Sequence, residues 1–491
     1  MIRYTIGFGS LLRDQGMTDG GMTDGAGIHR DAAGADVRSL LDRVRADGGM
    51  ALWLLFNAVV AVLALVEPLR PVTRAYMAAA IDWWTAEPLV TDGVLGVPFL
   101  PAGAVLYAPF AALPPVLADQ AWRLLAVAVL TLAVYRAARL IRPDAGSGVA
   151  QWVLVLAIPA ASVTIFGGQW GLMAFAVLLH ATVDVALGRD GRGGLLLALA
   201  VALTPQALLA ALLFAATHRR VLPSLLPGLA AVFLGPFLHA DPAYVARQYA
   251  ALAGALAAAA DGGRGLDAAA LLRTLGVAPA AVLMDALRLL ALAATLWAAV
   301  RACRRLYRPT AALVVLMLAV NGLLLFGPHT EEGAYAGLAV LAALAAFAEA
   351  ARRPRAALPV LLGALAVALG VRLFGAWLYE PLDGWLQPAL ALAFYGYLGM
   401  LLGTGRSLTD PPPEPMRIDV WLPNRVALVL CLLIPPVIGL YRLAAASSLP
   451  GRLASFGATD FLMLVVALNV LVFTVVTVSG PVLAWMRDRR P

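Results

Sequence analysis

The stretch GLLLALAVALTPQALLAALLFAATHRR, residues 194–220, decides how the chain crosses a membrane. Pro205 divides this stretch into two apolar halves, and each half is too short to span a bilayer core of about 30 Å alone. The stretch forms either one kinked transmembrane helix or a hairpin that enters and leaves on the same side. The choice sets the side of every later loop.

The distribution of arginine decides between these two forms. In helical membrane proteins, short loops rich in Arg lie on the cytoplasmic side. With a hairpin at 194–217 and a cytoplasmic N-terminus, all the Arg clusters fall on that side: Arg136/Arg139/Arg142, Arg189/Arg192, Arg219/Arg220, Arg301/Arg304/Arg305/Arg308, Arg352/Arg353/Arg355 and Arg487/Arg489/Arg490. A full crossing would place every later cluster outside. The sequence therefore predicts the hairpin.

Composition sets the broad class of the protein. Of its 491 residues, 62% are hydrophobic and 13% are charged, whereas soluble domains contain about 25% charged residues. Apolar runs long enough to cross a bilayer recur through the chain. We predict an all-α, polytopic integral membrane protein with about 11–13 transmembrane helices. The net charge of +7 comes mainly from loop arginines, so it does not indicate a nucleic-acid partner.

The residue inventory excludes several kinds of chemistry. The sequence contains no lysine, so a lysine nucleophile or Schiff base is impossible. Its two cysteines, Cys303 and Cys431, lie in or near apolar segments, and its five histidines are scattered without metal-ligand spacing. No motif indicates a metal or cofactor. A divalent cation held by carboxylates remains open.

The chain divides into four expected parts. Residues 1–48, rich in Gly and Asp, are expected to be cytoplasmic and largely disordered. Residues 49–402 form the main transmembrane domain. Residues 403–424 contain TDPPPEP and form an extended cytoplasmic linker. Residues 425–491 form a final pair of transmembrane helices.

The first extracytoplasmic loop, about residues 68–117, concentrates carboxylates, aromatics and prolines. Glu67 ends the first span, and Asp82 and Asp92 follow in the loop. Carboxylates of this kind act as general bases or bind a divalent cation, and Tyr76 and Trp84 could contact a sugar. The alternative is an interfacial aromatic belt with solvated acids. The amphipathic pattern predicts short helices at the membrane interface.

Four motifs appear in a fixed order. They are YMAAAIDWW followed by PFLPAGAVLYAPFAALPP, FGGQWGLMAFAVLLHA (Phe166–Ala181), GRGGLLLALAVALTPQALLAALLFAATHRR (Gly191–Arg220) and FGPHTEEGAYAGLAVLAALAA (Phe326–Ala346). In this order they resemble glycosyltransferase family 87, the polyprenyl-phosphate-mannose-type enzymes of the GT-C superfamily, over roughly residues 50–350. The resemblance implies a GT-C-like bundle with a catalytic first extracytoplasmic loop. It also implies a lipid-phosphate sugar donor, a glycan or lipid acceptor, and inversion at the transferred sugar.

The resemblance also implies roles for individual residues. The family has an Asp shortly before the position of Tyr76, and this sequence has none there, so Glu67 or Asp82 is left as the base that deprotonates the acceptor. Gln169 and His329 match positions of the family motifs and are expected to contact sugar or phosphate. Gln169 could instead cap the helix that it begins.

Two further sites near the outer helix ends carry charge. Glu331 and Glu332 precede a helix, where the macrodipole favours acids, although Glu331 could also face the substrate. Arg372 lies in the apolar run ALPVLLGALAVALGVRLFGAW, inside a span predicted at 357–378. The planar guanidinium suits a lipid phosphate. The alternative is that Arg372 snorkels to the lipid headgroups.

Together these features predict a glycosyltransferase of a bacterial inner membrane. It would transfer a mannose-like sugar from a polyprenyl-phosphate donor to an envelope glycan or lipid acceptor on the periplasmic face. The alternative is a non-catalytic transporter, flippase or assembly subunit of envelope polysaccharide synthesis on the same scaffold. Carboxylates in an outer loop favour transfer, whereas charges deep within the spans favour transport.

Overall fold

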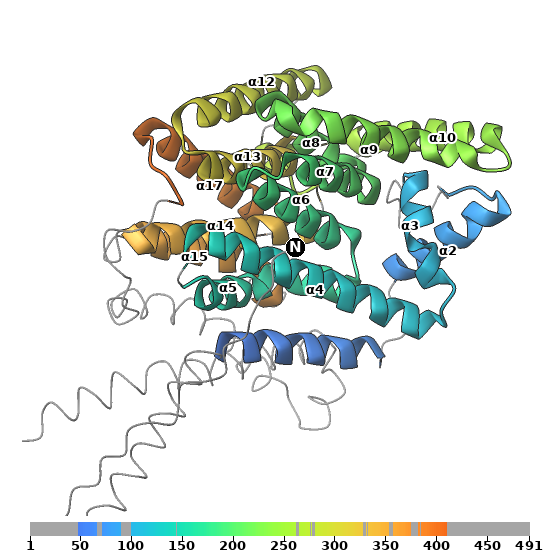
Figure 1. The fold of residues 1–491 in the computed structure, drawn as a ribbon, viewed down its shortest axis with the longest axis horizontal. Coiled ribbons are helices and arrows are strands. Elements are labelled where there is room, and N and C mark those ends of the chain that lie inside the picture. The colour runs from blue at the N-terminus through green and yellow to red at the C-terminus, as the bar shows by residue number, and fades with distance from the viewer. Residues whose placement is uncertain are drawn as a thin grey trace, which may run out of the picture.

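The computed structural model (Figure 1) describes residues 48–65, 71–89, 100–143, 145–261, 265–274, 276, 280–327, 330, 332–352, 357–374, 382 and 384–409. The regular elements among these residues are all helices, which confirms the all-α, polytopic class. Eight are long and apolar enough to cross a membrane: Gly48–Leu65, α4 (Pro115–Ile141), α5 (Gly146–Gly167), Arg219–Leu238, Val282–Arg305, α13 (Arg308–Phe326), Glu332–Arg352 and α17 (Leu386–Thr404).

The remaining elements are shorter or lie at the ends of these spans. They are α2 (Pro71–Thr85), α3 (Pro101–Ala111), α6 (Trp170–Ala186), α7 (Asp190–Leu203), η1 (Pro205–Ala207), α8 (Leu208–Thr217), η2 (Arg219–Val221), α9 (Leu222–Leu234), η3 (Gly235–Leu238), α10 (Pro242–Asp261), α11 (Ala268–Thr274), α12 (Ala281–Arg305), η4 (Glu332–Ala334), α14 (Tyr335–Arg352), α15 (Ala357–Ala368) and η5 (Val371–Phe374). The expected N-terminal segment, most of the linker and the final helix pair lie outside the described residues.

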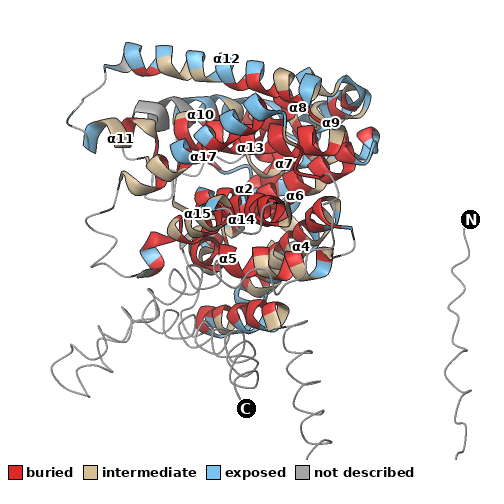
Figure 2. Ribbon diagram, turned by 90° about the vertical axis from the view of Figure 1, so that its left-hand side faces the viewer, coloured by how far each residue is buried: buried red, intermediate tan, exposed pale blue. Residues whose placement is uncertain are grey.

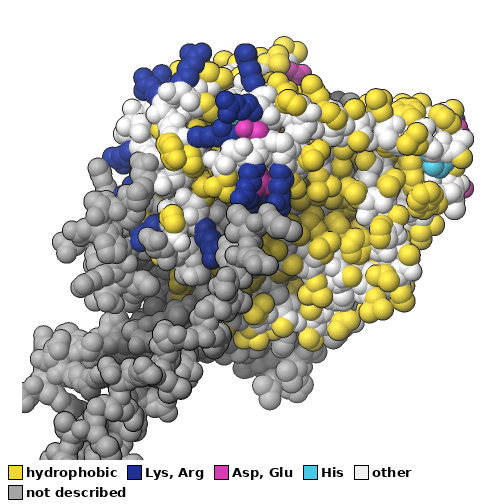
Figure 3. Space-filling view, viewed as in Figure 1, with side chains coloured by type: hydrophobic (Ala, Val, Ile, Leu, Met, Phe, Trp, Pro, Cys, Tyr) yellow, Lys and Arg dark blue, Asp and Glu magenta, His cyan; other side chains and the backbone are white. Residues whose placement is uncertain are grey.

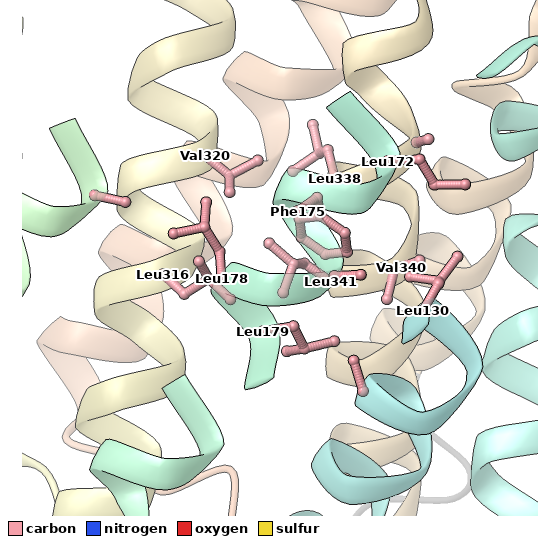
Figure 4. Close-up of a cluster of buried hydrophobic side chains, with 14 of the residues drawn as sticks. Leu130, Leu172, Phe175, Leu178, Leu179, Leu316, Val320, Leu338, Val340 and Leu341 are labelled. Carbon is pink, nitrogen blue, oxygen red and sulfur yellow. The ribbon is translucent and has the colours of Figure 1, made fainter. Parts of the chain in front are cut away.

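The core of the bundle is formed by α5, α6, α13 and α14. In the spans of α13 and α14, 89% of the most apolar window is buried, against 17% for Arg219–Leu238 and 22% for Val282–Arg305. The first two are therefore central, and the last two are peripheral and expose their apolar faces (Figure 2). Figure 4 shows how Phe175 and Leu179 of α6 pack among leucines and valines of α4, α13 and α14. Alanines along α14 allow this close approach.

The predicted hairpin is present in residues 190–217. Thr204 has an extended backbone (φ −150°, ψ 128°), and the helix stops there because Pro205 lacks an N–H. A Cβ on Gly194, near the start of α7, would lie 2.6 Å from the carbonyl oxygen of Val221, which follows α8. The start of α7 and the end of α8 therefore lie at the same end of the bundle, as the arginine distribution predicted.

The predicted span at 357–378 is wrong. Helix α15 ends at Ala368, and a 3-10 turn, η5, follows. The chain turns at Gly370, where a Cβ would lie 2.2 Å from the backbone of Pro159 in α5, so no side chain fits. Gln387 Nε2 donates to the carbonyl oxygen of Leu369 at 2.9 Å, which satisfies one of the carbonyls left open at the helix end. Arg372 is consequently outside any spanning helix.

The two ends of the bundle differ in their charge. Helices α2 and α3 lie at one end (Figure 1), which we call the loop end. Arginine side chains gather at the opposite end, the arginine end, beside a broad apolar surface (Figure 3). The two predicted interfacial segments of the first loop are thus short helices, and they lie away from the arginines. This is the arrangement that the arginine distribution predicted.

Candidate active site

The turn between α5 and α6, Gly167-Gly168-Gln169, forms the floor of the candidate site. Gly168 has φ +65°, the left-handed conformation that closes many helices, and Gln169 N–H donates to Thr164 O at 3.0 Å. A Cβ on Gly168 would also lie 2.7 Å from the methyl group of Thr73 in α2. Both backbone conformation and space therefore require glycine here.

A buried ion pair holds this turn from the side of α4. The guanidinium of Arg123 donates to both carboxylate oxygens of Asp119, each at 2.8 Å, and both side chains are 4% exposed. Arg123 also donates to the carbonyl oxygens of Ile165, at 2.7 Å, and Phe166, at the end of α5. A cation at a helix C-terminus satisfies open carbonyls and favours the helix dipole. The pair therefore fixes the turn that carries Gln169.

This ion pair was not among the features predicted from the sequence. The available signal was an acid and an arginine four residues apart at the start of an apolar span, where unpaired charges are costly. The carbonyl contacts, made across more than 40 residues of sequence, had no such signal.

Tyr76 of α2 joins the first loop to the same turn. Its hydroxyl accepts a hydrogen bond from the backbone N–H of Trp170 at 3.0 Å, one of the open donors at the start of α6. The Tyr76 ring is 2% exposed and meets Trp170 edge to face with centroids 5.0 Å apart. Tyr107 and Trp122 complete this aromatic cluster. Tyr76 therefore anchors the loop to the bundle, and its ring is covered by protein.

Gln169 reaches the segment η4 and does not cap its own helix. It occupies the N-cap position of α6 without a side-chain cap hydrogen bond. Its amide oxygen lies so close to η4 that a Cβ on Gly333 would be 1.9 Å away. Thr164 Oγ1 donates to Gly333 O at 3.0 Å and holds the two segments together. The capping alternative for Gln169 is therefore not realised.

Arg372 pairs with Glu332 beside Gly333. Arg372 Nη1 lies 2.5 Å from Glu332 Oε2, and the side chains are 55% and 10% exposed. Glu332 thus has a specific cationic partner in addition to its position in the first turn of η4. Because Gln169 contacts the same short segment, the structure brings Gln169, Glu332 and Arg372 to one place at the loop end, although they come from distant parts of the chain.

Asp82 lies apart from this group in the described contacts. It follows Tyr76 on α2 by about 9 Å along the helix axis and roughly 120° around it. Burial, and then the negative charge of Glu87, raise the pKa of the Asp82 carboxyl. The Asp82 backbone oxygen accepts hydrogen bonds from Glu87 N–H at 2.9 Å and from the Tyr244 hydroxyl at 3.4 Å. Asp82 therefore belongs to the junction between α2 and α10.

The two tryptophans of the first loop face different surroundings. Trp83 is 3% exposed and packs edge to face on His239 with centroids 4.8 Å apart. Trp84, about 100° further around the helix, is 66% exposed. Trp84 is available to lipid or substrate, whereas Trp83 fastens α2 to the segment before α10.

The segment after α9 braces both parts of the site. Just after α2, Tyr244 donates to Glu87 O at 2.7 Å, and Gln248 Oε1 accepts from Leu89 N–H at 2.9 Å. Just before η4, Leu266 N–H donates to Thr330 O at 2.9 Å. Residues of a single loop therefore contact the Asp82 region and the segment that carries Glu332.

Four predicted site residues, Glu67, Asp92, His329 and Glu331, lie outside the described residues. In the part of the chain that the structure describes, no three His, Cys, Asp or Glu side chains could together hold a metal ion. A divalent cation held by carboxylates of the first loop, Asp92 among them, stays a prediction.

One protein-family model matches part of the chain. The family model for glycosyltransferase family 87 matches residues 100–328, from α3 to just beyond α13. This region includes the Asp119–Arg123 pair and Gln169, whereas α2 and Arg372 lie outside it. No curated protein matches the chain.

Proposed function

We propose that this membrane protein, whose residues 100–328 match the family model for glycosyltransferase family 87, is a glycosyltransferase. Its donor is a polyprenyl-phosphate sugar of mannose type, and transfer occurs at the loop end. The acceptor is a glycan or lipid of a bacterial envelope. The loop end faces the periplasm of the inner membrane, since the arginine end has the composition of a cytoplasmic face.

The observation that carries this proposal is the position of Arg372. Its side chain is 55% exposed, is oriented by Glu332, and lies at the segment that Gln169 contacts. A guanidinium has five N–H donors in a planar fork, which matches the oxygens of a phosphate. A lipid-anchored phosphate would reach such a cation at the end of the bundle. The amide of Gln169 would then lie within reach of the attached sugar.

The proposed reaction is a direct displacement with inversion. A carboxylate of the first loop, Asp82 or Glu67, takes the proton of the acceptor hydroxyl. The acceptor oxygen forms a bond to C1 of the sugar while the bond from C1 to the phosphate oxygen breaks. The leaving phosphate keeps the electron pair, and Arg372 stabilises its charge. The raised pKa of Asp82 makes it a stronger base than an ordinary aspartate.

One observation favours the alternative, a non-catalytic transporter or flippase. The hairpin of α7 and α8 is a broken helix pair inside the bundle, and broken helices are common at transporter binding sites. The two functions differ in whether the bond between sugar and phosphate breaks.

The test uses the full chain in proteoliposomes with a radiolabelled polyprenyl-phosphate mannose. We expect labelled product and released lipid phosphate, and we expect Asp82→Asn or Glu67→Gln to abolish turnover while donor binding persists. Arg372→Gln should weaken donor binding by roughly tenfold. The matched control is Arg247→Gln, because Arg247 is an exposed arginine that also pairs with an acid, Asp241, at 3.4 Å. Donor movement across the bilayer without release of lipid phosphate would support the transporter instead.

A further inference from the structure

A cluster of arginines surrounds one buried acid at the arginine end. Asp184 of α6 is 0% exposed and forms ion pairs with three arginines, one from α4, one from the turn before α7 and one from α7. Arg136 of α4 contacts Oδ1 of Asp184, and it also lies 2.7 Å from His180 Nδ1. Arg192 Nε lies 3.1 Å from Oδ2, and Arg189 Nη1 lies 3.9 Å from Oδ1. One carboxylate thus orients three guanidinium groups.

The cluster carries more positive charge than its acids neutralise. A fourth arginine, Arg308, lies beside it and pairs with Asp190 at 2.6 Å. Four arginines against two aspartates leave a surplus of two positive charges. Arg189 and Arg192 are 60% and 66% exposed, so this surplus is presented at the surface of the bundle.

The turn between α6 and α7 creates this arrangement. Gly188 has φ +78°, a conformation that favours glycine, and the turn is closed by a hydrogen bond from Arg189 N–H to Asp184 O at 2.8 Å. Helix α7 starts at Asp190, so Arg189 and Arg192 stand at its N-terminal end. Oxygens of an anion are also favoured at such an end by the helix dipole.

An apolar strip continues from the arginines along α7. Arg192, Leu195 and Leu199 follow on α7 at spacings of three and four residues, which place them along one side of the helix, and Arg189 immediately precedes the helix. Leu195 is 56% exposed and Leu199 is 37% exposed. The side of α7 that carries the exposed cations therefore continues toward the middle of the bundle as a surface that suits a hydrocarbon chain. Charge and apolar surface occur in the order of a phospholipid, headgroup first and acyl chain next.

We propose that this site binds an anionic glycerophospholipid. Its phosphate lies between Arg189 and Arg192, and one acyl chain follows Leu195 and Leu199. The surplus of two charges predicts stronger binding of a lipid with two phosphates than of one with a single phosphate. Basic pockets between transmembrane helices bind such headgroups by this combination of fixed cations and apolar walls. The site is independent of sugar transfer, because it lies at the end of the bundle away from Arg372.

The test measures lipid binding to the purified full chain by native mass spectrometry. Cardiolipin, phosphatidylglycerol and phosphatidylcholine are titrated separately. We expect affinity to fall in that order, and we expect Arg189→Gln/Arg192→Gln to lower cardiolipin affinity roughly tenfold or more. The matched control is Arg219→Gln/Arg220→Gln, which removes the same charge from two exposed residues that follow α8 near the start of α7. This control should change affinity less than about threefold.

Each result decides for or against the site. Equal losses in the two double variants would show diffuse attraction to any basic surface and would overturn the proposal, as would no loss in either. Displacement of the lipid by millimolar glycerophosphate would show a site for free phosphate. The acyl-chain path is checked by Leu195→Ser, which keeps the arginines and should weaken lipid binding. Elution of every variant as a monodisperse peak establishes that it is folded.

Discussion

The two ends of the bundle use charge in different ways. At the loop end, the buried guanidinium of Arg123 donates hydrogen bonds to Asp119 and to carbonyl oxygens at the end of α5, so it fixes a turn. At the arginine end, Arg189 and Arg192 are mostly exposed around a buried acid, so they present charge to the surroundings. A buried, fully bonded cation builds a site, whereas an exposed, oriented cation is available to a ligand. Arg372, at the loop end, is of the second kind, since it is oriented by Glu332 and still 55% exposed.

The largest expected effect concerns the side of the membrane on which each end of the bundle lies. Thr85, the last residue of α2, and Thr404, the last residue of α17, are both exposed. In a background of Cys303→Ala and Cys431→Ala, we expect an impermeant thiol reagent on intact spheroplasts to label Thr85→Cys and leave Thr404→Cys unlabelled. Both positions should react after the membrane is opened. Labelling of position 404 alone would reverse the proposed orientation. Labelling of both positions in sealed spheroplasts would contradict the proposal that the two ends lie on opposite sides of the membrane.

The next effect tests the structural role of the buried cation at the loop end. Asp119→Asn leaves the Arg123 charge buried without its acid, so it should lower stability by about 3–5 kcal/mol. The pair Asp285–Arg288, at 3.1 Å on α12, provides the control, because its acid is 67% exposed. Asp285→Asn should cost at most about 1 kcal/mol. Thermal unfolding in one detergent measures both. Similar losses in the two variants would mean that Arg123 does not fix the turn.

A smaller effect separates the position of Gln169 from the stability of the turn. The Cβ of Gly333→Ala meets the end of the flexible Gln169 side chain, so the amide should move while the fold stays intact. We expect turnover to fall about tenfold, with little change in melting temperature, and Gln169→Ala should add no further loss to Gly333→Ala. Gly171→Ala is the control, because a Cβ there meets nothing within 4 Å. Additive losses of turnover in the double variant would show that Gly333→Ala does not act through Gln169.

The features that sequence predicted correctly depend on local pattern. The break at Pro205, the hairpin and the helix at Tyr76–Trp84 follow from apolar run length, proline and the placement of arginine. The early end of α15 was missed because it depends on contact between Gly370 and Pro159, which are distant in sequence. The Glu332–Arg372 pair was missed for the same reason, since an apolar run alone placed Arg372 inside a span.

The sequence narrowed the catalytic base to two candidate carboxylates but did not decide between them. Asp82 and Glu67 were chosen because the resemblance implies an Asp shortly before Tyr76, and residues 71–75 contain no acid. The structure places Asp82 at the junction with α10, where Tyr244 and Glu87 are its neighbours. A carboxylate pattern in a loop does not determine which side of a helix faces the substrate, because that depends on how the loop packs on a second loop.

The smallest expected effect distinguishes the two candidate bases through pH. Glu87 helps to raise the pKa of Asp82, so Glu87→Gln should lower that pKa. If Asp82 is the base, activity is lost as pH falls through this pKa. The acid limb of kcat/KM should then move to lower pH by a fraction of a unit in Glu87→Gln. Asp285→Asn, a distant acid on α12, should leave the limb in place.

The raised pKa of Asp82 also predicts how the stability of the folded protein depends on pH. Because the pKa of Asp82 is raised in the folded protein, its contribution to stability is present below the unfolded pKa and is lost as pH rises through the folded pKa. Asp82→Asn should therefore keep or slightly raise the free energy of unfolding at neutral pH, by less than about 1 kcal/mol, since Asp82 is partly solvated. Loss of turnover in Asp82→Asn with an unchanged melting temperature would identify the base. Full turnover in that variant, with an acid limb that Glu87→Gln does not move, would leave Glu67 as the remaining candidate.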